Sequence, residues 1–435
     1  MAGSPPISGS PLRRCKRRIF GTAVAILVLG VWPGRGAADP TTTGTDDGAI
    51  HGRLELLDTG DFSRSGTLAS ELGAGQADDG GADLRLDWAR VFGPWRFEFQ
   101  DLLTLVAGPE VALARLESPF AAPPPTWLGL TATTPDRGRV QASQTVDRLS
   151  VSYTTPDLVI KVGRQALTWG SGLVFRPMDL FDPFSPSALD TEYKPGTDMA
   201  YVQKLFADGS DLEFVAAPRP PRAGAGPSAD ASSLALRYNI RLLGLRTSWM
   251  VARDHGDWTG GLGLNGPLGG AVWNLELVPT GLDQGGTRLS ALANISDAVT
   301  VAGRNATVFA EYFHNGFGAL GSGLTYGDLP AALIDRLSRG QIFELRQDYL
   351  ASGASVELSP LVTAGPTLIV DLNDGSLLAL LSASWSVREN LTLVGGVQAP
   401  VGAARTEFGG LPLSAQTPLR LAPPTRVYVE LRRYF

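Results

Sequence analysis

The chain has 435 residues, of which 43% are hydrophobic and 18% charged, so it is either two or three soluble domains or one large β-barrel. A single cysteine and three histidines exclude a cysteine-based zinc site, an iron–sulfur cluster and a disulfide scaffold. The formal net charge of -6 argues against a nucleic-acid-binding surface, so no nucleic-acid partner is expected.

The first predicted element is an export signal. A basic block at 13–18 precedes an apolar run at 19–32, and small residues follow at 34–38. This order is typical of a secretory signal peptide, and the run is shorter than the roughly 20 residues of a membrane-spanning helix. We predict that residues 1–38 are cleaved after Ala38 and that 39–435 form the mature chain. Cleavage removes six basic residues, no acid and Cys15, which moves the net charge from -6 to -12.

Period-two alternation dominates the rest of the chain. In 95–100, for example, Trp95, Phe97 and Phe99 fall on one face and three polar residues on the other. Similar segments predict eighteen strands, most of them near the length that crosses a membrane when tilted; sixteen is the alternative count. The predicted strands are 49–58, 83–92, 95–107, 146–154, 157–164, 199–206, 211–217, 232–240, 243–253, 256–264, 271–279, 287–295, 299–314, 342–358, 361–372, 376–387, 391–399 and 425–435.

The connections differ in length according to the end of the strand. Those after even-numbered strands are short and rich in turn residues, as at 93–94, 155–156 and 296–298. All the long ones follow odd-numbered strands: 59–82, 108–145, 165–198, 218–231, 315–341 and 400–424. Short periplasmic turns opposite long extracellular loops are typical of an outer-membrane barrel, so the predicted fold class is all-β, a transmembrane antiparallel β-barrel.

The last strand ends on Phe435, which shares a face with Val427, Val429 and Leu431. An alternating strand closed by Phe resembles the C-terminal signal that the barrel-assembly machinery reads, although Arg433 departs from it. The resemblance implies that this machinery and periplasmic chaperones are partners. A soluble β-protein that ends in Phe by chance is the alternative.

Three stretches of the third long loop carry a more specific pattern. Residues 163–170 read GRQALTWG, 176–186 read RPMDLFDPFSP and 190–199 read DTEYKPGTDM. They resemble the GRQ…WG…DLF-NP pattern of large proteobacterial outer-membrane barrels, including the alginate-export-like and related porin-like families. This resemblance implies an outer-membrane channel or export pore and leaves the substrate open.

The same loop, 165–198, is predicted to fold against the lumen wall. It holds several large apolar side chains, among them Phe175, Phe181 and Phe184, which a solvent-exposed loop does not need. Its charges would then lie at a pore constriction; packing on the outer rim is the alternative. The candidate constriction residues are Arg164, Arg176, Asp179, Asp182, Glu192, Lys194 and Asp198.

A short helix is expected in the loop 315–341. Asp328 is placed to cap it, Pro330 suits its first turn and Gly340 is placed to end it.

Catalytic and metal-binding patterns are weak. His51, His255 and His314 lie far apart in the sequence, and no nucleophile motif accompanies them. The segment 254–257 contains possible ligands without a recognised metal-binding spacing. We therefore predict no enzymatic activity, no cofactor and no metal, with an outer-membrane hydrolase based on His255 or His314 as the remote alternative.

The predicted function is an outer-membrane channel that passes a small solute or an exported polymer by passive diffusion, so a small solute or a polysaccharide is the expected partner. A non-conducting barrel for surface binding or envelope assembly is the alternative. Inward-facing basic and acidic candidates balance, so the sequence predicts no strong ion selectivity. Outer-membrane lipid and lipopolysaccharide are expected partners, and both a monomer and a trimer fit.

Overall fold

The computed structural model describes residues 47–109, 111–113, 125–134 and 138–435. The predicted signal peptide, 1–38, and the start of the mature chain lie outside these residues.

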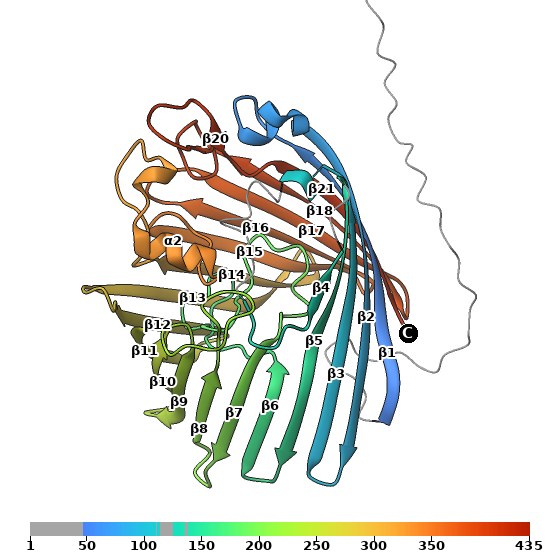
Figure 1. The fold of residues 1–435 in the computed structure, drawn as a ribbon, viewed down its shortest axis with the longest axis vertical. Coiled ribbons are helices and arrows are strands. Elements are labelled where there is room, and N and C mark those ends of the chain that lie inside the picture. Colours follow the sequence, from blue (N-terminus) through green and yellow to red (C-terminus); the bar gives the residue numbers. More distant parts are fainter. Residues whose placement is uncertain (1–46, 110, 114–124, 135–137) are drawn as a thin grey trace, which may run out of the picture. The chain divides into compact units, whose positions relative to one another are not determined.

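Within the described part, eighteen antiparallel strands close into one β-barrel (Figure 1). Each strand pairs with its neighbour along the chain, and the first pairs with the last, which closes the ring. The predicted fold class and the count of eighteen are confirmed. The strands are β1 (Asp47–Phe62), β2 (Gln76–Phe92), β3 (Trp95–Ala107), β5 (Val140–Thr154), β6 (Leu158–Gln165), β7 (Thr197–Leu205), β8 (Asp211–Ala217), β9 (Ser233–Leu242), β10 (Leu245–Asp254), β11 (Asp257–Leu268), β12 (Ala271–Gly281), β13 (Thr287–Val301), β14 (Arg304–His314), β15 (Asp348–Ser359), β16 (Val362–Asp371), β17 (Leu377–Arg388), β18 (Leu391–Val401) and β21 (Thr425–Tyr434).

Burial alternates along the strands as the sequence pattern predicts. In β21, Val427 is 42% exposed and Val429 49% exposed, whereas Tyr428 and Glu430 are buried. Backbone groups find partners all round a closed barrel, so apolar side chains can face outward and polar ones inward. This alternation distinguishes lumen-facing from outward-facing residues in every strand described below.

All long connections emerge at one end of the barrel and only short turns at the other, as predicted. Two turns differ from the prediction: β11 continues through 265–268, and β13 does not end before 296–298 but continues to Val301. Asp297 pairs with Val308 inside the ladder, and the chain reverses at Ala302 and Gly303, both with positive φ. The left-handed conformation of these two residues matches the twist of a two-residue hairpin, which explains why the reversal occurs there.

The first and last strands of the barrel meet at the closing seam. The backbone groups of Gly52 and Phe435 exchange two hydrogen bonds of 2.9 and 3.0 Å. A Cβ at Gly52 would lie 2.4 Å from the carbonyl oxygen of Arg85 and 2.7 Å from the Phe435 ring. Only glycine therefore permits this close approach of strand and ring.

The long loops carry the remaining elements. These are β4 (Thr131–Thr133), the helical turns η1 (Ser70–Ala74) and η2 (Tyr326–Asp328), the helix α2 (Ala331–Ser338), and the paired β19 (Leu411–Pro412) and β20 (Arg420–Leu421). The helix predicted after Asp328 is present, but its proposed cap is not. Asp328 instead accepts hydrogen bonds from Thr325 and caps η2, because Pro330 begins a separate helix.

In the described part of the chain, every helix is too short or too polar to cross a membrane.

Candidate functional site

The segment between β6 and β7, residues 166–196, lies inside the ring of strands (green in Figure 1). We call it the lumen loop. It contacts inward-facing side chains from both halves of the barrel, so it folds against the lumen wall rather than on the outer rim. Two stretches of it, which we call the first and second arms, reach different parts of the wall.

The first arm, residues 169–175, is held by three inward-facing glutamates. Trp169 donates its indole N–H to Glu213 of β8 at 2.9 Å, and Ser171 donates its backbone N–H to Glu276 of β12. Glu311 of β14 accepts the three successive backbone N–H groups of residues 173–175 at 2.6 to 2.8 Å. Charge-assisted hydrogen bonds of this kind are roughly twice as strong as neutral ones, so they hold the first arm on the part of the wall formed by β8, β12 and β14.

Apolar contacts reinforce the first arm. Trp169 and Phe181 pack edge-to-face at 5.5 Å within a buried cluster that includes inward residues of β7 to β10 and of β12. Phe175 stacks on Phe313 of β14 at 4.9 Å in a second cluster. Aromatic pairs in this geometry contribute about 0.5–1.5 kcal/mol beyond burial of their area. Phe175 and Phe181, two of the large apolar residues expected to need cover, thus pack on the wall.

The second arm, residues 187–193, binds the closing seam of the barrel. Arg53 of β1 donates to Asp190 at 2.6 Å and to Glu192 at 2.7 Å. Arg432 of β21 lies within 3.6 Å of Asp190 and 3.5 Å of Glu192. These cations hold the pKa of Asp190 below its usual range.

A buried ion pair ties the lumen loop to itself. Lys194 donates to Asp179 at 2.6 Å and to the carbonyl oxygen of Leu167 at the same distance. Burial raises the pKa of Asp179 and lowers the pKa of Lys194, so the charged form of each depends on the other. Nearby, Thr197 donates its hydroxyl to Asp182, which has a positive φ of 55°.

Arg164 and Asp198 lie apart from the other predicted constriction residues. They form a two-point ion pair at 2.8 and 3.0 Å and are buried in the wall where β6 turns inward. Asp198 lies on the opposite side of β7 from Met199, which packs in the lumen cluster. Leu128, just before β4, covers the pair with two backbone hydrogen bonds. This pair seals the wall and does not line the lumen.

Spaces remain on both sides of the lumen loop. A cavity of about 60 Å³ toward the long loops is lined by Arg176, Asp179 and Phe184, among others. A cavity of about 330 Å³ toward the short turns is lined by Ser171, Met178 and residues of β9 to β12. The lumen loop therefore forms part of the boundary of both spaces.

A second layer covers the lumen loop at the long-loop end. It consists of residues 315–347 and 402–424, which pack together around Leu333 of α2 and Leu411 of β19. Arg336 of α2 donates to Asp257 at 2.7 Å, and Gln341 contacts both Asp254 and the carbonyl oxygen of Leu180. We call this the upper layer.

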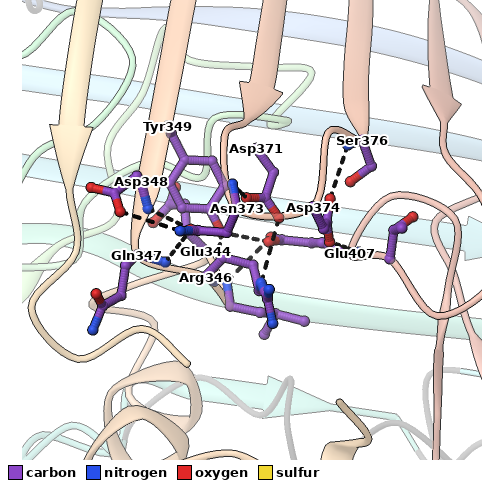
Figure 2. A network of polar contacts seen from close by, with 12 residues as sticks. Glu344, Arg346, Gln347, Asp348, Tyr349, Asp371, Asn373, Asp374, Ser376 and Glu407 are labelled. Carbon is purple, nitrogen blue, oxygen red and sulfur yellow. Dashed lines mark hydrogen bonds and ion pairs between the residues drawn. The ribbon is translucent and has the colours of Figure 1, made fainter. Parts of the chain in front are cut away.

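A network of acids fastens the upper layer to the wall (Figure 2). Tyr349 donates its hydroxyl to Glu407, whose other oxygen accepts the backbone N–H of Leu345 at 3.2 Å. Glu407 donates its own backbone N–H to Asp374 at 2.8 Å. Burial raises the pKa of Glu407 to about 8 and the pKa of Glu344 to about 7, and neighbouring acids add to both shifts.

The sequence analysis missed the wall residues that hold the lumen loop. Glu213, Glu276, Glu311 and Arg53 were not among the candidate constriction residues. The available signal in the sequence is a charged residue on the inward face of an alternating strand. This signal identifies a position on the lumen wall but does not identify the residue that it contacts. The histidines of the hydrolase alternative lie on different hairpins: His314 contacts Asp348 at 2.8 Å, and burial lowers the pKa of His255 to about 4.

Comparisons with known proteins bear on the fold. No family profile matches the sequence, and no curated protein matches it by sequence. The structure is similar to OccAB3 of Acinetobacter baumannii, with 11% identity, a TM-score of 0.52 and coverage of 89% of this chain and 99% of that one. It is also similar to Wzi of Escherichia coli, described as a carbohydrate-binding β-barrel involved in group 1 capsule assembly, with 9% identity, a TM-score of 0.52 and coverage of 88% and 84%. A BenF-like porin from Pseudomonas fluorescens Pf-5 matches with 11% identity, a TM-score of 0.50 and coverage of 90% and 99%. The chain therefore has the fold of bacterial outer-membrane β-barrels.

Proposed function

We propose that the protein is an outer-membrane channel whose bore is set by the lumen loop. The observation that supports this most directly is the anchoring of that loop on opposite parts of the wall. Its first arm binds β8, β12 and β14, and its second arm binds β1 and β21. A loop stretched across an eighteen-strand barrel narrows a lumen that would otherwise hold an aqueous channel.

The transported molecule is a small solute or an exported polysaccharide that moves by passive diffusion. The polymer alternative is supported by the alginate-export-like pattern in residues 163–199, and the small solute by the likeness to the BenF-like porin fold. Arg176, Asp182 and the paired charges of Asp179, Glu192 and Lys194 are the proposed constriction residues.

The proposed cellular context follows from the same features. The signal peptide directs export, Phe435 is read by the barrel-assembly machinery, and outward-facing residues contact outer-membrane lipid and lipopolysaccharide. The barrel acts as a monomer or as a trimer.

A non-conducting barrel is the second candidate, and the upper layer favours it. Residues 315–347 and 402–424 pack into one apolar cluster beside the lumen loop, which makes two layers of chain at the long-loop end. The fold likeness to Wzi, itself described as carbohydrate-binding, supports a surface-binding role of this kind.

Single-channel conductance in a planar bilayer separates these candidates. The decisive variant is Glu311→Gln, because it replaces one of the oxygens that accept three backbone N–H groups with an amide donor. The matched control is Glu357→Gln, at an exposed site near the short-turn end of β15.

A channel with a loop constriction gives small conductance steps in the native protein and larger ones in Glu311→Gln, with the control unchanged. A native protein that is silent while Glu311→Gln conducts indicates a plug. If both are silent and both migrate as folded, heat-modifiable barrels, the channel proposal fails and the surface-binding role replaces it.

A further inference from the structure

A groove lies on the outer face of the barrel, across the wall from the lumen. Five outward side chains form one register row across β6 to β10. The row consists of Val162, Ala200, Ala216, Leu234 and Arg253, each paired with the next. The two alanines make a trough, because Val162 and Leu234 rise on either side, with exposed fractions of 55% and 54%.

Residues Trp127 and Leu128, just before β4, deepen this trough. Trp127 and Leu128 lie over the wall, held there by the hydrogen bonds of Leu128 to Arg164 and Asp198. The resulting groove has a volume of about 560 Å³, and its lining is almost entirely apolar. Asp198 is the acid in the lining, and Arg164 neutralises it at 2.8 Å.

The row ends on a cation with unused hydrogen-bonding capacity. Arg253 lines the groove, and its buried Nε–H has no hydrogen-bond acceptor among the described residues. Within the described part of the chain, its ion-pair partner is Asp230, at 3.5 Å, and the Asp230 side chain is 89% exposed. The Arg253 side chain is 40% exposed, so its guanidinium can be reached by a ligand that brings acceptor oxygens.

We propose that lipopolysaccharide binds this groove, with an acyl chain along the alanine trough and a phosphate on Arg253. The proposal rests on the outer-membrane location proposed above. The groove lies on the face that alternation assigns to lipid, and Arg253 lies one residue before the end of β10 at the long-loop side. An acyl chain whose width matches the trough makes dispersion contacts with side chains that would otherwise lack them. The guanidinium of Arg253 binds phosphate oxygens through two parallel hydrogen bonds.

Native mass spectrometry of the full protein extracted from outer membranes tests this proposal. The native protein retains one lipopolysaccharide after detergent exchange. Ala216→Trp fills the trough and Arg253→Gln removes the phosphate partner, so each lowers the retained fraction by about tenfold or more. The matched controls are Ala310→Trp, at an exposed outward position on β14, and Arg222→Gln, on the exposed loop beside the groove; both retain the lipid.

Four results would overturn the proposal. The first is a native protein without bound lipopolysaccharide, and the second is retention that Ala216→Trp leaves unchanged. The third is a dimer or trimer that Ala216→Trp dissociates, which would assign the groove to a second copy of the chain. Retention of a glycerophospholipid alone also contradicts it. Conductance is measured on the same samples: a channel that conducts but binds no lipid refutes the groove proposal and leaves the channel proposal intact.

Discussion

At the scale of single residues, the lumen loop depends on charges that water does not reach. The carboxylate of Asp179 is fully buried and that of Glu311 equally so. Taking such groups out of water costs several kcal/mol each, and only a cation or several N–H donors offset this cost. Each buried acid therefore fixes a partner, which makes the position of the loop specific.

The first prediction concerns Lys194→Met. It leaves the Asp179 carboxylate buried without its cation and should lower the free energy of unfolding by about 3–5 kcal/mol. Urea unfolding in lipid vesicles measures this. The control, Lys204→Met, breaks an exposed pair with Asp157 and should change stability by less than about 1 kcal/mol. Equal effects of the two variants would contradict the role of burial.

The second prediction concerns pH. Glu407 has a pKa raised to about 8, so it is neutral in the folded protein at pH 6 and charged at pH 9. A group whose pKa is raised on folding contributes stability that is fully present below its unfolded value and is lost as pH rises through the folded value. The attachment of residues 402–424 should therefore weaken between about pH 5 and pH 9.

Trypsin cleavage at Arg405, an exposed residue two positions before Glu407, reports this attachment. The cleavage rate of the native protein should rise with pH relative to that of Glu407→Gln, whose side chain stays neutral throughout. Parallel pH profiles for the two proteins would show that Glu407 does not control the loop.

At the scale of elements, the hairpins show where local sequence and barrel geometry conflict. The turn between β9 and β10 places Leu243 at a φ of 52°, and its side chain is fully exposed. A left-handed conformation costs a non-glycine residue about 1–2 kcal/mol, and asparagine tolerates it better. The strand register fixes this turn despite its unfavourable residue.

The third prediction follows from this turn. Leu243→Asn should stabilise the barrel by about 0.5–1 kcal/mol, because it relieves the strain and loses no packing. The free energy of unfolding in vesicles measures the gain. Leu242→Asn, one residue earlier in β9, has no positive φ to relieve and should bring no gain. A gain in Leu242→Asn or a loss in Leu243→Asn would refute the strain.

At the scale of the whole molecule, closure joins β1 to β21 and leaves the Phe435 side chain outside the closed barrel. Its backbone completes the seam through Gly52, while its side chain is 54% exposed. The phenyl ring of Phe435 therefore contributes little to the stability of the folded barrel and remains accessible to an assembly factor.

The fourth prediction separates assembly from stability. Phe435→Ala should lower the amount of barrel in the outer membrane several-fold and change the unfolding free energy of the refolded protein by less than about 1 kcal/mol. Quantitative blotting of outer membranes and vesicle unfolding measure the two effects. Val427→Ala, an outward residue of the same strand, should leave the amount unchanged. A Phe435→Ala protein that accumulates normally would refute the proposed signal.

The sequence by itself determined the strands, their number and the end of the barrel that carries the long loops. These features follow from the period of two and from turn residues, which are local along the chain. It also indicated that residues 165–198 pack on the wall, because their large apolar side chains need cover. The misplaced turn at 296–298 shows the limit of local information: polar residues there are compatible with a strand whose inner face is polar.

The tertiary structure alone decided which charges meet. Arg53 and Asp190 are 137 residues apart, and Phe175 and Glu311 are 136 apart. Contacts of this kind depend on how many strands close the ring and how they are staggered, which no single segment encodes. For the same reason, Arg164 and Asp198 belong to the wall although they border the lumen loop in sequence. The side of the sheet on which a residue lies is a property of the register, and the register is set by all the strands together.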